Sequence, residues 1–482
     1  MDIAKLKHVH FTGIKGVGNT ALALCLRDLG IKITGSDVEE IFVTDEILKE
    51  NKIKWNVGFG EKKLYPKPDL LITTAGHGGL LNPEVQRAKE LKIPVTTYAE
   101  FLAKLANTKE VIAVCGVGGK TTTASMVAVL LNEAHLNPSF AIGVGKIYPL
   151  GYSGRFDKNG KYFVCEADDY VVSPGVDNTP KFMLLKPKIL VVTNIEYDHP
   201  DIYKSFGEAI KVFRNLFEKL PEEGILVACI DNPNVVHVIK DLQEKVITYG
   251  FSPKADWQIG GVEFKEGKTL FTLYSKKQNK TVRYLELRIP GRFNVQNATA
   301  AFIVGHNLGI NEIELKKGIK AYLGCRRRFE SMGTFNEALF IDDYAHHPKE
   351  VMSILKAVKE WYPNRRIITI FQPHTYSRTK ALFSEFSQSF IDSDVVGLMD
   401  IYSSAREKKD ESVSSEILTN EVKKYKKDAF FLGDHKKTLD WLKKNIKKGD
   451  VVLTMGAGDI FHLYKYLDLK GQNLQGSKRD LV

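Results

Sequence analysis

A lysine and three threonines directly follow a glycine-rich segment in the first third of the chain. An apolar run ends at Cys115, and Gly116 to Gly119 includes three glycines before Lys120 and Thr121. Glycines let backbone N–H groups approach phosphate oxygens, and a helix that begins behind them adds positive partial charge. In such a loop the lysine contacts the β- and γ-phosphates of a nucleotide, and the threonine hydroxyl contacts Mg²⁺.

This segment departs from the strict pattern G-x-x-x-x-G-K-[ST], because Val114 stands where the first glycine belongs. A glycine-rich turn with a chance Lys-Thr is therefore an alternative. The apolar strand before the segment and the helix-forming residues from Ala124 to Asn132 favour a phosphate loop. The predicted phosphate contacts are Gly116, Gly118, Gly119, Lys120, Thr121 and Thr122.

Carboxylates and a histidine end two further buried strands. Glu166, Asp168 and Asp169 follow an apolar run, and a strand that starts at Ile189 leads to His199. An acidic residue at a strand end near a phosphate loop is where Mg²⁺ is held, although an exposed acidic turn is the alternative. His199 is a candidate metal ligand or base, and the competing interpretation is a structural histidine.

A second glycine loop opens the chain. The strand His8–Thr12 leads into Gly13-Ile14-Lys15-Gly16-Val17-Gly18, and a later strand ends near Asp37. This is a Rossmann-type opening, but its glycine order is G-x-x-G-x-G rather than G-x-G-x-x-G. A nicotinamide-dependent oxidoreductase is thus an alternative that leaves the Lys-Thr loop unexplained. Asp37 is either a ligand or a turn residue.

Polar clusters also end the predicted strands of the last third, Ala338–Ile341, Ile367–Phe371 and Val451–Thr454. Ligands of open parallel sheets bind beyond the carboxyl ends of the strands, so these clusters are candidate site residues. Arg326–Arg328 places three positive charges in a row. One or two of them facing a phosphate is plausible, with the rest solvated.

The composition is that of an ordinary globular protein. The fractions of hydrophobic residues (43%) and charged residues (26%) are typical of globular proteins. The length of 482 residues suggests about three domains. No apolar run approaches the roughly 20 residues of a membrane span, and we see no signal peptide. Five scattered cysteines indicate a reducing, cytoplasmic compartment. The formal charge of +11 favours small anionic substrates over nucleic acid, because no nucleic-acid motif stands out.

Taken together, these motifs resemble the Mur ligase family. The matching pieces, in the family's order between residues 10 and 459, are HFTGIKGVG, GSD, GGKTTT, EADDY, TNIEYDH, GRFNVQNATAA, RRRFE, DDYAHHP, FQPHTYSR, DIY and MGAGD. The resemblance implies an α/β fold of three domains: a Rossmann-like UDP-sugar-binding domain (1–107), a central P-loop ATP-binding domain (108–322) and a Rossmann-like C-terminal ligase domain (323–482).

The resemblance also implies an activity. An ATP-dependent ligase of this kind forms an amide bond between the carboxylate of UDP-N-acetylmuramate and an amino acid, L-alanine, through an acyl phosphate, with ATP and Mg²⁺. That reaction belongs to cytoplasmic peptidoglycan precursor synthesis, and so to cell wall biogenesis, cell shape and cell division. The alternatives are a murein peptide ligase, which joins a peptide to the same nucleotide sugar, and a non-catalytic nucleotide-binding relative.

Site residues follow from the resemblance motif by motif. The residues for the UDP-sugar are Gly13, Gly16, Gly18 and Asp37, and those for the metal are Thr121, Glu166 and His199. Beyond the loop, the residues for ATP are Asn294 or Asn297 at adenine, with Arg327 or Arg328 and Asp343 from the third domain. The residues near the amino acid are Tyr344, His347 and Arg378, and those for catalysis are Lys120, His199, Arg327, His347 and Arg378.

Three places depart from the family's pattern. Val117 and Gly118 replace a Thr-His pair in the phosphate loop, and Phe293 replaces a histidine in the adenine motif. Thr375 replaces an arginine that would hold the amino acid's carboxylate. Loss of that fork-shaped partner weakens the expectation of free L-alanine as the acceptor.

Overall fold

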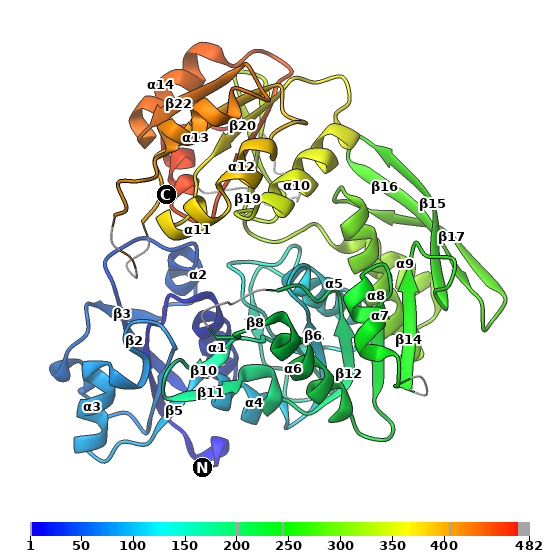
Figure 1. Ribbon diagram of the computed structural model, residues 1–482. Coiled ribbons are helices and arrows are strands. Elements are labelled where there is room, and N and C mark those ends of the chain that lie inside the picture. Colours follow the sequence, from blue (N-terminus) through cyan, green and yellow to red (C-terminus); the bar gives the residue numbers. More distant parts are fainter. Residues whose placement is uncertain (1, 198–201, 243–244, 404–406, 408, 471–482) are drawn as a thin grey trace. The chain divides into compact units, whose positions relative to one another are not determined.

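The computed structural model describes residues 2–197, 202–242, 245–403, 407 and 409–470 (Figure 1). The chain divides into two compact units. The first comprises Met1–Val262, Phe271–Leu287 and Phe293–Tyr322, and the second comprises Glu263–Leu270, Arg288–Arg292 and Leu323–Val482. Among the described residues, no helix is long and apolar enough to cross a membrane. His199, a predicted metal ligand and catalytic residue, lies outside the described residues.

The first unit begins with a five-stranded parallel sheet in the order β3-β2-β1-β4-β5. Its strands are β1 (His8–Thr12), β2 (Lys32–Asp37), β3 (Lys54–Val57), β4 (Leu70–Thr73) and β5 (Val95–Thr97), and its helices are α1 (Val17–Asp28), α2 (Asp45–Glu50), α3 (Pro83–Glu90) and α4 (Tyr98–Ala106). The strand order reverses between β1 and β4, which is where Rossmann-type sheets bind ligands. The Rossmann-like prediction for this segment is confirmed.

A ten-stranded sheet follows, in the order β17-β16-β15-β14-β13-β12-β6-β9-β7-β8. Its strands are β6 (Glu110–Cys115), β7 (Ser139–Ala141), β8 (Gly154–Arg155), β9 (Tyr162–Glu166), β12 (Pro187–Val192), β13 (Ile225–Cys229), β14 (Val246–Gly250), β15 (Trp257–Lys265), β16 (Lys268–Ser275) and β17 (Lys280–Leu287). Strand β6 pairs in parallel with β12 and β9. Both its faces are covered, which explains its continuous apolar run.

Helices of the first unit connect these strands. They are α5 (Lys120–Glu133), α6 (Phe206–Glu218), α7 (Pro233–Ile239), α8 (Arg292–Asn307) and α9 (Glu312–Ala321). Helix α5 begins at Lys120, four residues before the helix-forming run from Ala124. A small antiparallel hairpin, β10 (Val171–Ser173) with β11 (Asp177–Pro180), was not predicted from the sequence.

Helix α1 of the first sheet packs directly on strands β7 and β8 of the larger sheet. The contact is close at Gly154, where an added Cβ would lie 1.9 Å from the Ala21 carbonyl oxygen. Nearby, the Cys25 thiol donates to the Phe140 carbonyl at 3.2 Å. Because the two sheets belong to one unit, this packing brings the glycine loop before α1 toward the edge of the larger sheet.

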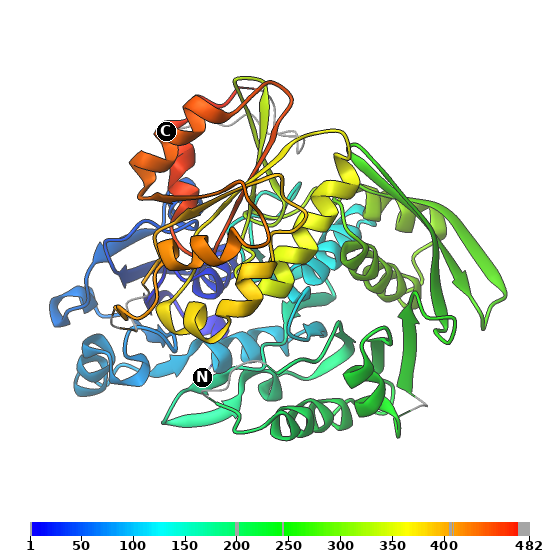
Figure 2. The ribbon, with the colours of Figure 1, turned by 45° about the horizontal axis from the view of Figure 1, so that its top comes forward.

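The second unit contains a six-stranded sheet in the order β18-β19-β23-β20-β21-β22, in which only β18 is antiparallel to its neighbour. The yellow-to-red elements of Figures 1 and 2 form it. The strands of the sheet are β18 (Glu330–Phe335), β19 (Ala338–Asp343), β20 (Ile367–Phe371), β21 (Val395–Met399), β22 (Ala429–Gly433) and β23 (Val451–Met455). The helices of this unit are α10 (Pro348–Trp361), α11 (Tyr376–Ala381), α12 (Phe383–Gln388), α13 (Ser415–Val422), α14 (His435–Asn445) and the 3₁₀ helix η6 (Ile460–Tyr466). The predicted α/β class is confirmed.

Candidate active site

The Lys-Thr glycine loop joins β6 to α5, and its backbone requires glycine at two positions. Gly116 has φ +127°, and a Cβ there would lie 2.3 Å from Thr193 Oγ1 and 2.7 Å from the Asn194 carbonyl oxygen. Gly119 has φ +82°, and a Cβ there would lie 2.7 Å from Asn297 Oδ1. The glycines therefore permit both a left-handed backbone and close approach of neighbouring groups.

Asn194 holds this loop in shape. Its Oδ1 accepts hydrogen bonds from the N–H groups of Val117 and Gly118, both at 2.9 Å, and its Nδ2 donates to the Gly118 carbonyl, also at 2.9 Å. Asn194 belongs to the TNIEYDH motif, but no role was predicted for it. The relevant pattern is register: β12 pairs with β6 as far as Cys115, so residues just beyond β12 must adjoin the loop.

Lys120 lies at the start of α5 with its ammonium over the loop. Its Nζ is 3.5 Å from Asp169 Oδ1 and hydrogen-bonds the Gly116 carbonyl, and its side chain is 16% exposed. Thr122 follows in the first turn of the helix and is half-buried. A partly exposed ammonium at a helix N-terminus gives this loop the positive charge that a polyphosphate needs.

Thr121 and Glu166 meet beside the loop, as the sequence predicted. Thr121 Oγ1 donates to Glu166 Oε2 at 2.9 Å, and the Gly143 N–H donates to Glu166 Oε1 at 2.7 Å. Burial raises the pKa of Glu166, and the charge of Lys120 lowers it in part. A desolvated carboxylate next to a hydroxyl is an oxygen donor set that suits Mg²⁺, so these residues fit the predicted metal.

A cavity of about 370 Å³ lies between the two glycine loops of the first unit. One wall comes from the first loop and α1, including Gly16, Gly18 and Asn19. The same cavity is also lined by Lys120 and Glu166. One chamber therefore touches both predicted anion-binding loops.

Lys181 and Asp168 form a second ion pair in the wall of this cavity. Lys181 Nζ is 2.8 Å from Asp168 Oδ2. Burial raises the pKa of Asp168, but the charges of Lys181 and Lys120 lower it more, to about 2. Sequence reasoning did not select Lys181 as a site residue. It follows the β10–β11 hairpin, which only the fold brings back to Asp168.

The first glycine loop is held by Asp37, which is 1% exposed. Its carboxylate accepts from the N–H groups of Lys15 and Val38 at 2.7 and 2.8 Å. A Cβ on Gly13 would lie 2.7 Å from Thr74 Cγ2, and one on Gly18 would lie 2.8 Å from the Tyr98 ring. Asp37 thus fixes the loop itself, and its predicted contact with the UDP-sugar stays a prediction.

Lys15 of the same loop turns into the protein interior. Its side chain is 1% exposed, and its Nζ hydrogen-bonds the Glu40 carbonyl and lies 3.7 Å from Asp45 Oδ1. The ammonium also sits 4.9 Å from the centre of the Phe42 ring. Burial raises the pKa of Asp45, which the charge of Lys15 partly offsets. The ammonium of Lys15 is therefore engaged by neighbouring groups of the protein and is not exposed to a ligand.

Asn294 and Asn297, the two predicted adenine contacts, are buried on α8 and hydrogen-bonded to each other at 3.2 Å. Asn297 is also the residue that a Cβ on Gly119 would strike. The α8 asparagines therefore line the back of the phosphate loop in this structure. Their contact with adenine stays a prediction.

In the second unit, Arg327 is buried and its guanidinium faces its own unit. Nε donates to Asp342 Oδ2 at 2.9 Å, and the terminal nitrogens donate to the carbonyls of Gly456 and Gly458. Arg328 is half-buried, with its guanidinium 5.2 Å from the Tyr344 ring centre. Of the two arginines, Arg328 is the more accessible.

Asp343 ends β19 and accepts two backbone hydrogen bonds at 2.8 Å, from Phe329 and Ala345. Burial raises the pKa of Asp343 to about 6, against the lowering effect of Arg328. His347 begins α10 as its N-cap, and its Nδ1 accepts from the Lys349 N–H at 3.4 Å. Arg378 lies on α11, and its Nη1 is 3.3 Å from His374 Nδ1.

Thr375 is the N-cap of α11 and has φ +69°, an unusual conformation for a β-branched residue. Its Oγ1 accepts from the Arg378 N–H at 3.3 Å. The residue that replaces the family's arginine therefore has a local structural role at the turn that carries Arg378.

The chain matches three segments of known Mur ligases. It matches the Mur ligase family catalytic domain over residues 8–110, the Mur ligase middle domain over 114–305 and the Mur ligase glutamate ligase domain over 327–458. The UDP-N-acetylmuramate–L-alanine ligase of Acetivibrio thermocellus is 39% identical over 96% of this chain and 95% of that protein. The enzyme of the same name from Caldanaerobacter subterraneus subsp. tengcongensis is 38% identical over 96% and 97%.

Solved structures share the fold. The UDP-N-acetylmuramate–alanine ligase of Thermotoga maritima aligns with a TM-score of 0.80 at 24% identity, covering 96% of this chain and 98% of that chain. A murein peptide ligase from Psychrobacter arcticus aligns with a TM-score of 0.67 at 22% identity, covering 96% and 98%. The predicted three-domain architecture is confirmed by these matches.

Proposed function

The chain belongs to the Mur ligase family, and from that premise we propose that it joins the carboxylate of UDP-N-acetylmuramate to L-alanine at the expense of ATP. The observation that carries the proposal is a cavity whose lining includes Gly16 and Gly18 of the first loop together with Lys120 and Glu166. A reaction between a nucleotide-sugar carboxylate and ATP needs one chamber that admits both.

The chemistry explains why cations gather there. A carboxylate does not react with an amine in water, because its oxygen is too poor a leaving group. Transfer of the γ-phosphoryl group makes an acyl phosphate, whose phosphate leaves when the amine attacks. The first step brings two anions together, and Lys120 and Lys181 supply positive charge in the cavity wall. When bound, Mg²⁺ would be held by Thr121 and Glu166 and would neutralise phosphate charge.

We assign the remaining predicted residues as follows. Gly13, Gly16 and Gly18 admit the diphosphate of the UDP-sugar to the N-terminus of α1. Arg328 serves ATP from the second unit, and Arg327 positions the turn that contains Gly456 and Gly458. These roles agree with the exposure of the two arginines.

The acceptor is L-alanine by analogy with the named relatives. The motif departure at Thr375 makes the acceptor the point to test, because a peptide-adding enzyme with the same fold also aligns with this chain. A peptide brings its carboxylate farther from the reacting amine, so the two reactions need different carboxylate partners.

The test incubates the full chain with UDP-N-acetylmuramate, ATP, Mg²⁺ and each amino acid in turn, plus L-alanyl-D-glutamyl-diaminopimelate. Phosphate release and product mass are followed. We expect L-alanine alone to give an adduct of the nucleotide sugar. Turnover with the tripeptide alone would show that the acceptor is a peptide and not L-alanine. Tight binding of ATP and of UDP-N-acetylmuramate without turnover for any amine would identify a non-catalytic relative.

A further inference from the structure

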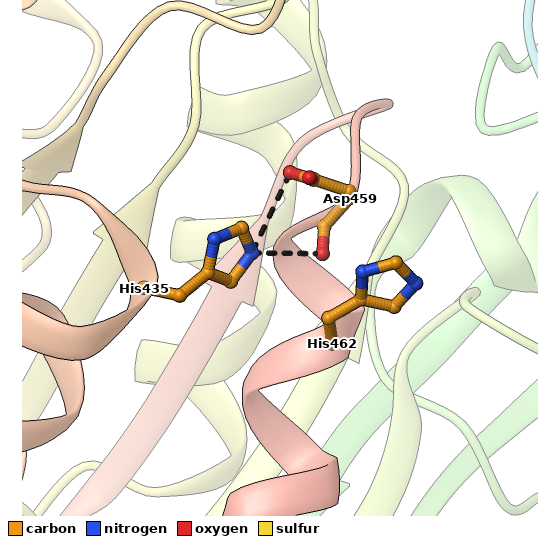
Figure 3. Close-up of side chains that lie close together, drawn as sticks. All are labelled: His435, Asp459 and His462. Carbon is orange, nitrogen blue, oxygen red and sulfur yellow. Dashed lines mark hydrogen bonds and ion pairs between the residues drawn. The ribbon is translucent and has the colours of Figure 1, made fainter. Parts of the chain in front are cut away.

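Two histidines and an aspartate converge in the second unit, and none of the three was predicted as a site residue. His435, Asp459 and His462 each offer a ligand atom, and these atoms all lie within 4.8 Å of one another (Figure 3). They come from two chain segments. His435 is the first residue of α14, while Asp459 and His462 flank the start of η6, just after β23.

Hydrogen bonds already orient two of these side chains. His435 Nε2 lies 3.1 Å from the Asp459 carbonyl oxygen and 3.5 Å from Asp459 Oδ1. Gln372 Nε2 donates to Asp459 Oδ1 at 2.7 Å, and Gln372 Oε1 accepts from the Ile460 N–H at 3.0 Å. Gln372 therefore fixes both the carboxylate and the backbone that carries it, which is what an outer-sphere partner of a metal ligand does.

The cluster is also accessible. The side chains of His435 and Asp459 are 28% and 35% exposed, and His462 is half-buried. An ion can therefore enter without opening the fold. A single carboxylate with two imidazoles also differs from the all-acidic surface groups that arise by chance on charged proteins.

We propose that His435, Asp459 and His462 bind one divalent transition-metal ion, with Zn²⁺ the best match. Imidazole suits Zn²⁺ and its neighbours in the first transition row, whereas Mg²⁺ prefers oxygen ligands throughout. Three protein ligands leave the fourth tetrahedral position to water. Zn–N and Zn–O bonds of about 2.1 Å put tetrahedral ligand atoms about 3.4 Å apart, so modest side-chain rotation closes the cluster.

Binding has a structural consequence. His435 would bind the ion through Nε2 with its imidazole proton carried on Nδ1, and the ion would tie the start of α14 to η6. The turn before Asp459 contains Gly456 and Gly458, whose carbonyls accept hydrogen bonds from Arg327. The ion therefore stiffens the turn on which the Arg327 guanidinium rests, and it stabilises the second unit by binding the folded state alone.

The test uses the full chain, purified without a histidine tag, stripped with a chelator and held in excess Mg²⁺. Co²⁺ is titrated while its visible d–d absorption is recorded, and Zn²⁺ is then added as competitor. We expect one equivalent of Co²⁺ to give bands typical of four or five ligands, and Zn²⁺ to displace it. Absence of any such band up to millimolar Co²⁺ would overturn the proposal.

Variants assign the site. His462→Gln and His435→Gln should each weaken Co²⁺ binding about 10-fold or more. His237→Gln is the matched control, because His237 is an exposed histidine of α7 in the first unit. Circular dichroism of each variant verifies folding. Equal Co²⁺ affinity in all three variants would place the ion elsewhere and reject this site. Zn²⁺ should raise the thermal midpoint of the parent chain and leave that of His462→Gln unchanged.

Discussion

The Gly13–Gly18 loop and the Gly116–Lys120 loop are built alike. Each follows a buried parallel strand and leads into a helix, and each is fixed by one polar side chain at the carboxyl end of a neighbouring strand. In the first loop that side chain is the carboxylate of Asp37, and in the second it is the neutral amide of Asn194.

The lysines of the two loops have opposite placements. Lys15 is 1% exposed and is taken up by Glu40, Asp45 and Phe42. Lys120 is 16% exposed and lines the cavity. The first loop therefore offers a ligand backbone donors and shape, and the second also offers charge. A glycine loop can position a phosphate through its backbone N–H groups alone, whereas phosphoryl transfer also needs an accessible positive charge such as that of Lys120.

The largest expected effect comes from exchanging the two lysines for methionine. Lys120→Met should lower kcat by about 10²–10³-fold, because one charge partner of the reacting phosphate is lost. Its thermal midpoint should also fall, because the buried Asp169 loses its charge partner. Lys15→Met should leave kcat nearly unchanged, because the Lys15 side chain is buried. It should lower the thermal midpoint, because Asp45 loses its charge partner. Steady-state kinetics and scanning calorimetry separate the two, with Lys158→Met as an exposed control. Equal losses of kcat in the two variants would contradict the inference that only Lys120 contributes to the reaction.

Alanine at the glycines sharpens the steric half of the comparison. Gly116→Ala puts a Cβ 2.3 Å from Thr193 Oγ1 at φ +127°, whereas Gly16→Ala meets its nearest atom at an ordinary 3.4 Å. We expect Gly116→Ala to cost about 1–3 kcal/mol of unfolding free energy, and Gly16→Ala less than about 1 kcal/mol. Chemical denaturation measures both. A tolerated Gly116→Ala would contradict the close approach seen here.

The residues that fix the loops should differ in a smaller way. Asn194→Ala leaves the N–H groups of Val117 and Gly118 without their acceptor, which loosens the second loop. We expect the KM for ATP to rise about 10-fold, equivalent to about 1.4 kcal/mol, with the KM for the nucleotide sugar little changed. Asp37→Asn should show the reverse pattern. Loss of both affinities in either variant would mean that the loops act as one structure.

The smallest effect concerns pH. The folded-state pKa of Asp168 is lowered to about 2 from 3.8, so this group contributes stability that is present above pH 4 and lost as the pH falls through 2. Lys181→Met removes one of the charges that lower this pKa. The stability difference between parent and variant should therefore shrink as the pH falls from 4 toward 2, as followed by urea unfolding. A stability difference that is constant across that range would show that Lys181 does not lower the pKa of Asp168.

Local patterns made much of the fold predictable from the sequence. Strands β1 and β20 have the predicted bounds, because continuous apolar runs are bounded by glycine or polar residues. The meeting of Thr121 with Glu166 was also predicted, since the carboxyl ends of neighbouring parallel strands share one edge.

Contacts that depend on distant pairing were not predictable in the same way. The roles of Asn194 and Lys181 require knowing which strand lies beside β6 and where a hairpin returns. The orientation of Arg327 required the position of the Gly456 carbonyl, 129 residues away. Three adjacent arginines are alike in sequence, and only the fold separates the buried one from its neighbours.

The burial of Lys15 has a consequence for chemical reactivity. Amine-reactive acylating agents attack the neutral form of a lysine that they can reach, and this side chain is sealed behind Phe42 and Trp55. Lys120 projects into the chamber instead. Of the two loop lysines, acylation followed by peptide mass mapping should therefore modify Lys120 and spare Lys15. If nucleotide binds in the chamber as proposed, it should protect Lys120, and the degree of acylation at Lys120 would report occupancy without a catalytic assay.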